Sequence, residues 1–310
     1  MKKVICPGEA LIDFVSTDLG KALKETKGFI KKAGGAPANV AAAISKLGAE
    51  AYFCGTVGDD AFGRFLEETF KKNNINTELM FKLDNHNTTF AFVSLMEDGE
   101  RDFEFARDAD SCLEFQMIKD KLEEFDLYHF GSATAFLDGR LRETYYKLKE
   151  YALNNNKIIT FDANYRESLF GDRKEVFISH CMDFIKDSDL VKLSEEEALL
   201  ISGQADIKEA SEFLVSLGCK ALIITLGKDG AMITTNDKQV LVPTKELEMK
   251  DATGAGDAFI GAVIAQMLNT PEKDIIEIVR IANLVGGITT TRIGALESIP
   301  TWNEVSKYRN

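Results

Sequence analysis

The most informative stretch of this 310-residue chain is Asp251-Ala252-Thr253-Gly254-Ala255-Gly256-Asp257-Ala258-Phe259. Three small residues precede an acid, and apolar spacing predicts a helix over Ala255–Leu268. Gly254 and Gly256 let the backbone approach a ligand closely. We expect the amides of residues 254–257 to be unpaired and, with the helix dipole, to bind an anion such as a transferring phosphoryl group. A lone Gly-x-Gly-Asp is also typical of an ordinary helix start, so the rest of the chain must decide.

Outward from this stretch, short apolar runs alternate with helical patterns. The runs predict strands at Val4–Cys6, Tyr52–Val57, Leu127–Phe130, Ile158–Phe161, Leu190–Leu193 and Leu222–Thr225. Helices are predicted at Pro37–Leu47, Ala61–Asn73, Gly139–Asn154, Glu195–Ser202, Ile207–Leu217 and Pro271–Thr291. This alternation predicts an α/β fold, with a mostly parallel sheet covered by helices on both faces. We expect one domain over residues 1–310.

One segment does not fit a parallel sheet. Thr88–Leu95 and Arg101–Phe105 alternate as strands around Asp98-Gly99, which is a strong hairpin signal. We interpret residues 88–106, together with residues 12–32, as a small β lid beside the main domain. A two-stranded hairpin is marginal in water, so its apolar face should pack on the ligand or on a second subunit. The prediction is a homodimer formed through the lids.

Composition excludes several classes of protein. The net charge is −13 and the pI about 4.9, so the surface repels phosphate backbones and nucleic-acid binding is not expected. The five cysteines are scattered without Cys-x-x-Cys spacing, which argues against disulfides and against a zinc site. The first residues do not resemble a signal peptide, and no run of 18 apolar residues occurs. We therefore expect a cytoplasmic protein without membrane contact.

A second motif joins the first. It reads Gly34-Gly35-Ala36-Pro37-Ala38-Asn39-Val40-Ala41, followed by Leu47-Gly48. With both motifs present, nearly the whole chain resembles the ribokinase-like (PfkB) family of carbohydrate kinases. The resemblance implies the ribokinase-like three-layer fold and a kinase in which Asp257 is the catalytic base and Gly254, Ala255 and Gly256 form the anion hole. It also implies that sugar hydroxyls are bound by Asp13, Gly34, Gly35 and Asn39.

The resemblance extends to ATP and metal ions. The implied ATP site contains Asn164, Lys192, Thr225, Gly227, Gly230 and Asn283, although Ile224–Gly230 alone would simply predict a hairpin. Glu197 is implied to order Mg²⁺ through water, with Ser194 standing where the family commonly has Asn. Many members also hold a monovalent cation, K⁺ being the candidate here. The matching positions are Asp251, Thr253, Thr289, Arg292, Gly294 and Ser298.

The identity of the sugar depends on two arginines. Arg107 and Arg166 lie in segments that resemble fructokinases and 2-keto-3-deoxygluconate kinases, and an Arg can hold sugar oxygens, a carboxylate or phosphate. We expect phosphorylation of a primary hydroxyl, converting fructose to fructose 6-phosphate. The alternatives are 2-keto-3-deoxygluconate kinase, then ribokinase, and in a different class a non-catalytic sugar or nucleotide sensor. The chain has neither a Walker A motif nor a dinucleotide-binding fingerprint after its first strand.

Overall fold

The main sheet lies at the centre of the molecule. The computed structural model describes residues 2–95, 101–131 and 133–308. Within these residues the sheet has nine strands, ordered β13 (Gln239–Val242), β12 (Ala231–Thr234), β11 (Ala221–Thr225), β10 (Leu190–Ser194), β9 (Ile158–Asp162), β8 (Leu127–Phe130), β1 (Lys3–Pro7), β4 (Glu50–Gly58) and β5 (Asn76–Leu83). The strands from β11 to β5 are parallel, while β12 and β13 are antiparallel additions. The predicted α/β class is confirmed.

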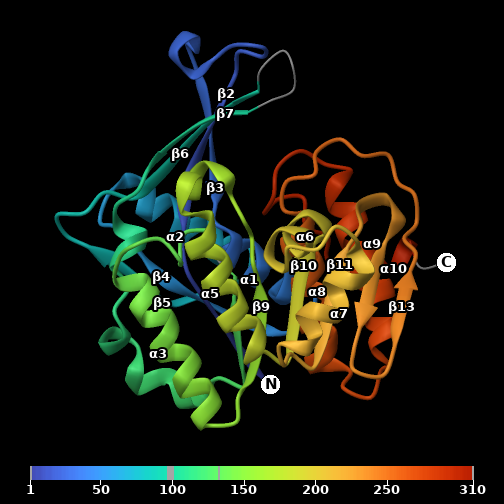
Figure 1. Ribbon diagram of the computed structural model, residues 1–310. Helices are drawn as coiled ribbons and strands as arrows, with labels where there is room; N and C mark the ends of the chain where they lie inside the picture. The colour runs from blue at the N-terminus through green and yellow to red at the C-terminus, as the bar shows by residue number, and fades with distance from the viewer. Residues whose placement is uncertain (1, 96–100, 132, 309–310) are drawn as a thin grey trace.

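Helices cover both faces of this sheet and make the fold three-layered (Figure 1). One core lies under α1 (Ala36–Lys46), α2 (Ala61–Lys72), α8 (Ala255–Asn269) and α9 (Ile275–Thr290). The other lies under α3 (Arg140–Asn154), α5 (Lys174–Lys186), α6 (Glu195–Ser202) and α7 (Ile207–Ser216). No helix among the described residues is long and apolar enough to cross a membrane.

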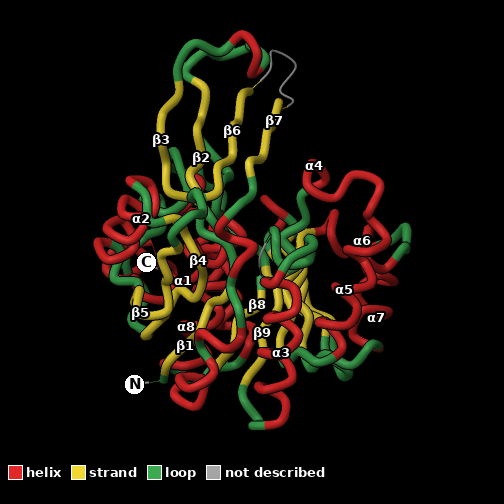
Figure 2. The backbone as a smooth tube through the Cα atoms, turned by 90° about the vertical axis from the view of Figure 1, so that its left-hand side faces the viewer, coloured by secondary structure: helices red, strands yellow, loops and turns green. Residues whose placement is uncertain are grey.

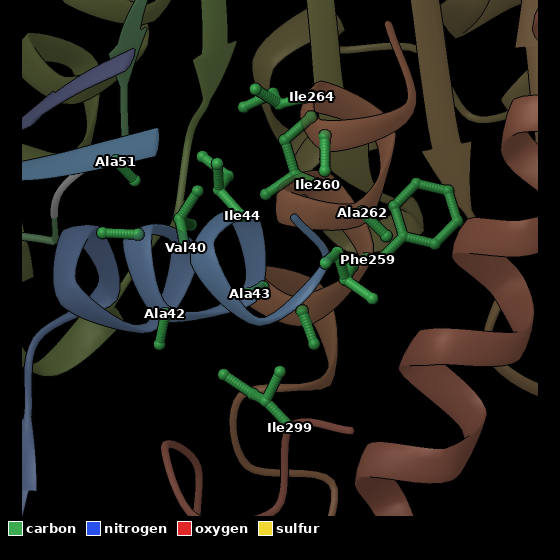
Figure 3. Close-up of a cluster of buried hydrophobic side chains, with 14 of the residues drawn as sticks. Val40, Ala42, Ala43, Ile44, Ala51, Phe259, Ile260, Ala262, Ile264 and Ile299 are labelled. Carbon is green, nitrogen blue, oxygen red and sulfur yellow. The ribbon is translucent and has the colours of Figure 1, made fainter. Parts of the chain in front are cut away.

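Helices α1 and α8 pack closely because both present small residues at their contact. A Cβ on Gly261 of α8 would lie 2.4 Å from Cβ of Ala43 in α1. Figure 3 shows Val40 and Ile44 of α1 beside Ile260 and Ile264 of α8. This contact matters for function, because α1 and α8 begin at the two sequence motifs.

A second sheet projects from the first (Figure 2). It contains, in spatial order, β3 (Phe29–Gly34), β2 (Leu11–Ser16), β6 (Thr89–Leu95) and β7 (Arg101–Ala106). Phe14 and Phe92 stack on one face with centroids 5.1 Å apart, and Phe62 of α2 lies 5.8 Å from Phe14. The structure therefore has the predicted lid strands, packed on α2. The predicted turn at Asp98-Gly99 lies outside the described residues.

Some elements differ from the sequence-based expectations. Strands β5 and β13 and helix α5 were not predicted, and β12 was implied only as the second strand of the hairpin at Ile224–Gly230. The predicted helix Pro271–Thr291 begins only at Ile275, because Asp274 is its N-cap and accepts from the amide of Ile276. Pro271 and Glu272 lie in the preceding turn. The opening Pro271-Glu272 suggested a helix start, but the capping residue stands two positions later.

Candidate active site

The candidate site lies where the parallel strands end at their carboxyl edge. Glu9 follows β1, Asp162 ends β9, Ser194 ends β10 and Thr225 ends β11. The start of α8 faces the same edge, because Asp257 in its first turn contacts residues after β3 and β9. Ligands of open α/β sheets characteristically bind at this edge.

Asp257 is held by two amides. Its Oδ2 accepts from Nδ2 of Asn39 in α1 at 2.9 Å, and its Oδ1 accepts from Nδ2 of Asn164 at 3.2 Å. The carboxylate is 8% exposed, and the side-chain oxygens of Asn39 and Asn164 are buried without a partner among the described residues. Asn164 has φ +47°, a left-handed conformation that Asn tolerates better than most residues. Two amide oxygens beside the acid thus remain able to accept from a ligand hydroxyl.

The protonation of Asp257 reflects opposing effects. Burial raises the pKa of Asp257, while the hydrogen bond from Asn39 and the charges of Lys192 and Arg166 lower it. Burial prevails, so the pKa lies above that of an ordinary Asp. A carboxylate with a raised pKa accepts a proton more readily than an ordinary exposed carboxylate.

The turn before Asp257 has the geometry of an anion site, with one correction. Gly254 has φ +76° and caps α8. The amide of Ala255 donates to the carbonyl of Ala252 at 3.2 Å, so the expectation that all four amides are unpaired was wrong for this one. The turn uses that bond to close on itself. Among the described residues, the amides of Gly254, Gly256 and Asp257 have no acceptor.

A buried ion pair beside this turn was not anticipated. Nζ of Lys192 lies 3.0 and 3.2 Å from the two carboxylate oxygens of Asp162, and a Cβ on Gly256 would lie 2.9 Å from that Nζ. Burial alone would lower the pKa of Lys192, but the charges of Asp162 and Glu197 raise it by more than burial lowers it. The pKa therefore lies above that of an ordinary Lys, and the side chain keeps its positive charge. Gly256 thus leaves room for a positive charge beside the glycine turn. A buried-strand pattern ending in Asp was the signal for Asp162 in the sequence.

The predicted sugar ligands come together at the base of the lid. A Cβ on Gly34 would lie 2.2 Å from Oδ2 of Asp13, so only glycine leaves that carboxylate its place. Gly35 has φ +116°, and its Cβ would lie 2.4 Å from the carbonyl of Glu9. Glu9 is buried and accepts from the amide of Ala36 at 3.1 Å. Glu9, which the sequence reasoning missed, therefore fixes the turn into α1.

The two arginines occupy different settings. Nε of Arg107 pairs with the buried Asp110 at 3.1 Å, and its other nitrogens donate to the carbonyls of Asp138 and Thr134. Arg107 therefore joins the end of β7 to the loop before α3. Arg166 donates to the carbonyl of Tyr165, and its charge lowers the pKa of Asp257. Of the two arginines, the structure shows only Arg166 acting on the base.

Four of the six residues predicted for the ATP site, Thr225, Gly227, Gly230 and Asn283, lie around β11–β13. The segment after β11 forms the hairpin that Ile224–Gly230 suggested, with Gly227 at φ +56° and Gly230 at φ +99°. A Cβ on Gly230 would lie 2.2 Å from the carbonyl of Val242, and Nδ2 of Asn283 donates to that carbonyl at 2.9 Å. Thr225 donates to the carbonyl of Leu193 in β10. Asn164 lies instead at Asp257.

Glu197 is held by backbone amides. Its Oε2 accepts from the amide of Ser194 and its Oε1 from that of Tyr165, both at 2.8 Å, while Ser194 caps α6 in a reciprocal capping box. Ser at position 194 thus has a structural role as the N-cap. The described residues contain no group of three His, Cys, Asp or Glu side chains that could hold a metal. Mg²⁺ typically relies on one or two carboxylates and on the phosphates of its nucleotide, which fits a lone Glu197.

Part of the predicted cation site is assembled. Asp251 accepts from the amide of Gly294 at 2.8 Å and from the hydroxyl of Thr253 at 2.6 Å, which together lower its pKa against the effect of burial. The hydroxyl of Ser298 is buried without a hydrogen-bond partner among the described residues, so its oxygen is available to bind a cation. Thr289 instead bonds Val285 within α9, and the side chain of Arg292 pairs with Glu304. These two residues offer main-chain carbonyls only.

A scan of protein families matches residues 1–302 to the pfkB family carbohydrate kinase. The three-layer fold, the lid and the buried Asp257 at the glycine turn agree with that match. The chain belongs to the pfkB family of carbohydrate kinases and is a sugar kinase.

Individual sugar kinases resemble the chain over nearly its whole length. The chain is 36% identical to fructokinase-1 of Zea mays, covering 97% of this chain and 96% of that one. A sugar kinase of Pyrococcus horikoshii solved with ATP has a TM-score of 0.87 and 33% identity, covering 100% and 98% of the two chains. Fructokinase of Vibrio cholerae, solved with fructose, ADP and calcium, has a TM-score of 0.87 and 27% identity, covering 100% and 99%.

Proposed function

We propose that this protein is an ATP-dependent fructokinase that converts fructose to fructose 6-phosphate. The observation that carries the proposal is the setting of Asp257. Its carboxylate is buried, is oriented by Asn39 and Asn164, and directly follows a glycine turn with unpaired amides. Fructose is favoured because the maize and Vibrio relatives are fructokinases and because Asp13, Gly34, Gly35 and Asn39 suit a neutral polyol.

The geometry suggests that different residues accept the proton and stabilise the charge during phosphoryl transfer. Asp257 accepts the proton of the primary hydroxyl as its oxygen attacks the γ-phosphorus, and the bond to the bridging oxygen of ADP breaks. The amides of Gly254, Gly256 and Asp257, with the ammonium of Lys192, face the charge of the transferring group. When bound, Mg²⁺ supplies charge neutralisation between the β- and γ-phosphates. Glu197 would hold it through water, and Asp251, Thr253, Gly294 and Ser298, with the carbonyls of Thr289 and Arg292, would hold K⁺.

The nucleotide is placed by the remaining residues. Gly227 and Gly230 leave the backbone of the β11–β12 turn open to ATP, and Thr225 lies at its start. Asn283 fixes the carbonyl of Val242 beneath the adenine region, because its amide is committed to that oxygen. Asn164, by contrast, would contact the sugar hydroxyl or the γ-phosphate, since it lies on Asp257.

Replacing Asp257 by Asn tests the base. The introduced amide can accept from one of Asn39 and Asn164 and, once the other amide flips, donate to its unpaired oxygen. The fold and ATP binding should therefore persist, whereas kcat should fall by roughly 10²–10⁴. The measurement is fructose phosphorylation coupled to ADP release, with ATP binding by calorimetry as the control. Near-normal turnover of the variant would show that Asp257 is not the base. A wild-type protein that binds but never phosphorylates any sugar would favour the sensor.

Arg166→Ala tests the choice of sugar. A guanidinium beside the site would hold the carboxylate of 2-keto-3-deoxygluconate, whereas Asp13 would repel it. We expect wild-type kcat/KM to favour fructose over 2-keto-3-deoxygluconate and ribose, and Arg166→Ala to leave that order unchanged. A tenfold preference for the sugar acid that Arg166→Ala abolishes would instead identify a 2-keto-3-deoxygluconate kinase. Arg173→Ala, an exposed arginine paired with Asp138, is the matched control.

A further inference from the structure

The glycine turn at residues 251–257, called the anion turn below, is contacted by the segment 294–299. This segment lies between α9 and α10 (Trp302–Tyr308). The amide of Gly294 donates to Oδ2 of Asp251 at 2.8 Å. A Cβ on Gly254 would lie 2.8 Å from Cβ of Ala295, so the two backbones are in close contact. Any shift of the segment 294–299 would therefore displace the turn that begins α8.

A lysine from a distant part of the chain holds this segment. Lys46, the last residue of α1, donates from Nζ to the carbonyl of Leu296 at 2.8 Å and to that of Ile299 at 3.1 Å. Leu296 and Ile299 are themselves buried in the core. A buried carbonyl without a donor is costly, so one ammonium satisfies both. It also lies at the C-terminus of α1, where a positive charge is favoured by the helix dipole.

The other end of α1 contacts the base. Asn39, in the first turns of α1, donates to Asp257, and α1 packs closely on α8 through Gly261. One rigid helix thus touches the base directly and the anion turn through the segment 294–299. The relative position of the carboxylate and the amides is consequently set by α1 at both of its ends.

We propose that Lys46 is a positioning residue for phosphoryl transfer, acting through the segment 294–299 on the amides of the anion turn. It rests on the proposed roles of Asp257 and of that turn. Lys46 touches neither sugar nor ATP in this account. Its loss should affect the transfer step, because misplacement of a reacting centre by about 1 Å can cost on the order of 10²-fold in rate.

The test compares Lys46→Met, Lys46→Arg and Ile44→Val. Ile44 is a buried residue of the same helix, and in Figure 3 it lies toward Ile260 and Ile264 while Ile299 lies on the opposite side of α1. Its trimming weakens α1 without touching the segment 294–299. We expect Lys46→Met to lower kcat by about 10- to 100-fold, with the sugar KM changed less than about twofold. Lys46→Arg keeps the donors and should retain most of kcat.

A readout independent of turnover separates positioning from general stability. Amide hydrogen exchange of residues 251–257 and 294–299 should accelerate in Lys46→Met but not in Ile44→Val, at temperatures equally far below each Tm. If Lys46→Met loses no more kcat than Ile44→Val, or loses it without faster exchange in these segments, the proposal is overturned. If Lys46→Met does not fold, Lys46→Gln, which keeps one donor, takes its place with the same criteria. Because the exchange measurement needs no substrate, it stands even if Asp257→Asn shows that the base was misassigned.

Discussion

At the scale of single residues, the site is a balance of charges in a buried space. Asp162, Glu197 and Asp257 surround one ammonium, that of Lys192. Removing a partner from such a buried pair typically costs about 3–5 kcal/mol, because the remaining charge is left uncompensated. Lys192 therefore offsets part of the negative charge of these carboxylates, and its removal should destabilise the protein.

The pH dependence of turnover should report the hydrogen bond between Asn39 and Asp257. That bond lowers the pKa of the carboxylate, so Asn39→Leu should raise it. A base acts when deprotonated, and the acidic limb of kcat/KM should therefore move to higher pH. Asn39→Asp, which places a second carboxylate beside the first, should move it further still.

The limb itself is the quantity to compare, because Asn39 is also expected to bind the sugar and its replacement will raise KM at every pH. The measurement is kcat/KM from about pH 4 to 9. An acidic limb that stays in place in both variants would show that Asp257 does not carry the titration.

At the scale of elements, the lid has two faces with different partners. Phe14, Phe90 and Phe92 pack with Phe62 of α2, which anchors the lid to the main domain. The opposite face carries Asp13 and points away from α2, as the alternation of a strand requires. The sugar contact proposed for Asp13 would thus depend on how firmly the aromatic face holds the lid.

Phe14→Ala should loosen the lid while leaving the phosphoryl site intact. Phe14 is half-buried, so the loss of stability should be smaller than the roughly 3–5 kcal/mol of a fully buried Phe. We expect the sugar KM to rise several-fold while kcat at saturating sugar changes little. Phe213→Ala is the control, because Phe213 is also half-buried but lies on α7, in the other core of the main domain. A fall in kcat with unchanged KM would place Phe14 in the transfer step instead.

At the scale of the whole molecule, the second face of the lid, which carries Asp13, also carries apolar side chains. Val15, Ile30 and Val93 are neighbours in adjacent strands on that face, and Ile30 is 55% exposed. An apolar strand face in water is unfavourable, and a second lid is the partner of matching shape. We propose a homodimer joined through the lids.

Light scattering during size exclusion at micromolar concentration tests the dimer. The wild type should have twice the chain mass, and Ile30→Glu should reduce it to one. Leu241→Glu is the matched control, because Leu241 is similarly exposed, at 57%, but lies on β13, an edge strand of the main sheet and not of the lid sheet. A monomeric wild type would refute lid-mediated dimerisation.

Much of the fold could be predicted because the apolar pattern of a segment matches the position that the segment takes in the folded protein. The six predicted core strands all occur, within a few residues at their ends, since buried parallel strands are continuous apolar runs. Strands β5 and β13 were missed because they are the sheet edges, where polar residues interrupt the run. The short β12 was implied only as the partner strand of the hairpin at Ile224–Gly230. Helix α5 was missed because its apolar positions, Phe177, Cys181 and Phe184, are mixed with charged residues.

The sequence alone determined the two glycine motifs, the acid after the second of them and the chemistry that follows from an acid beside unpaired amides. Local backbone rules suffice for these features, because glycine conformation and helix starts are set by neighbours in the chain. Only the tertiary structure decided which groups orient that acid. Asn39 lies 218 residues from Asp257, Asp162 lies 30 from Lys192, and Lys46 lies 250 and 253 from the carbonyls it holds. Such pairings depend on how α1, α8 and the ends of parallel strands pack together, and no local pattern encodes them.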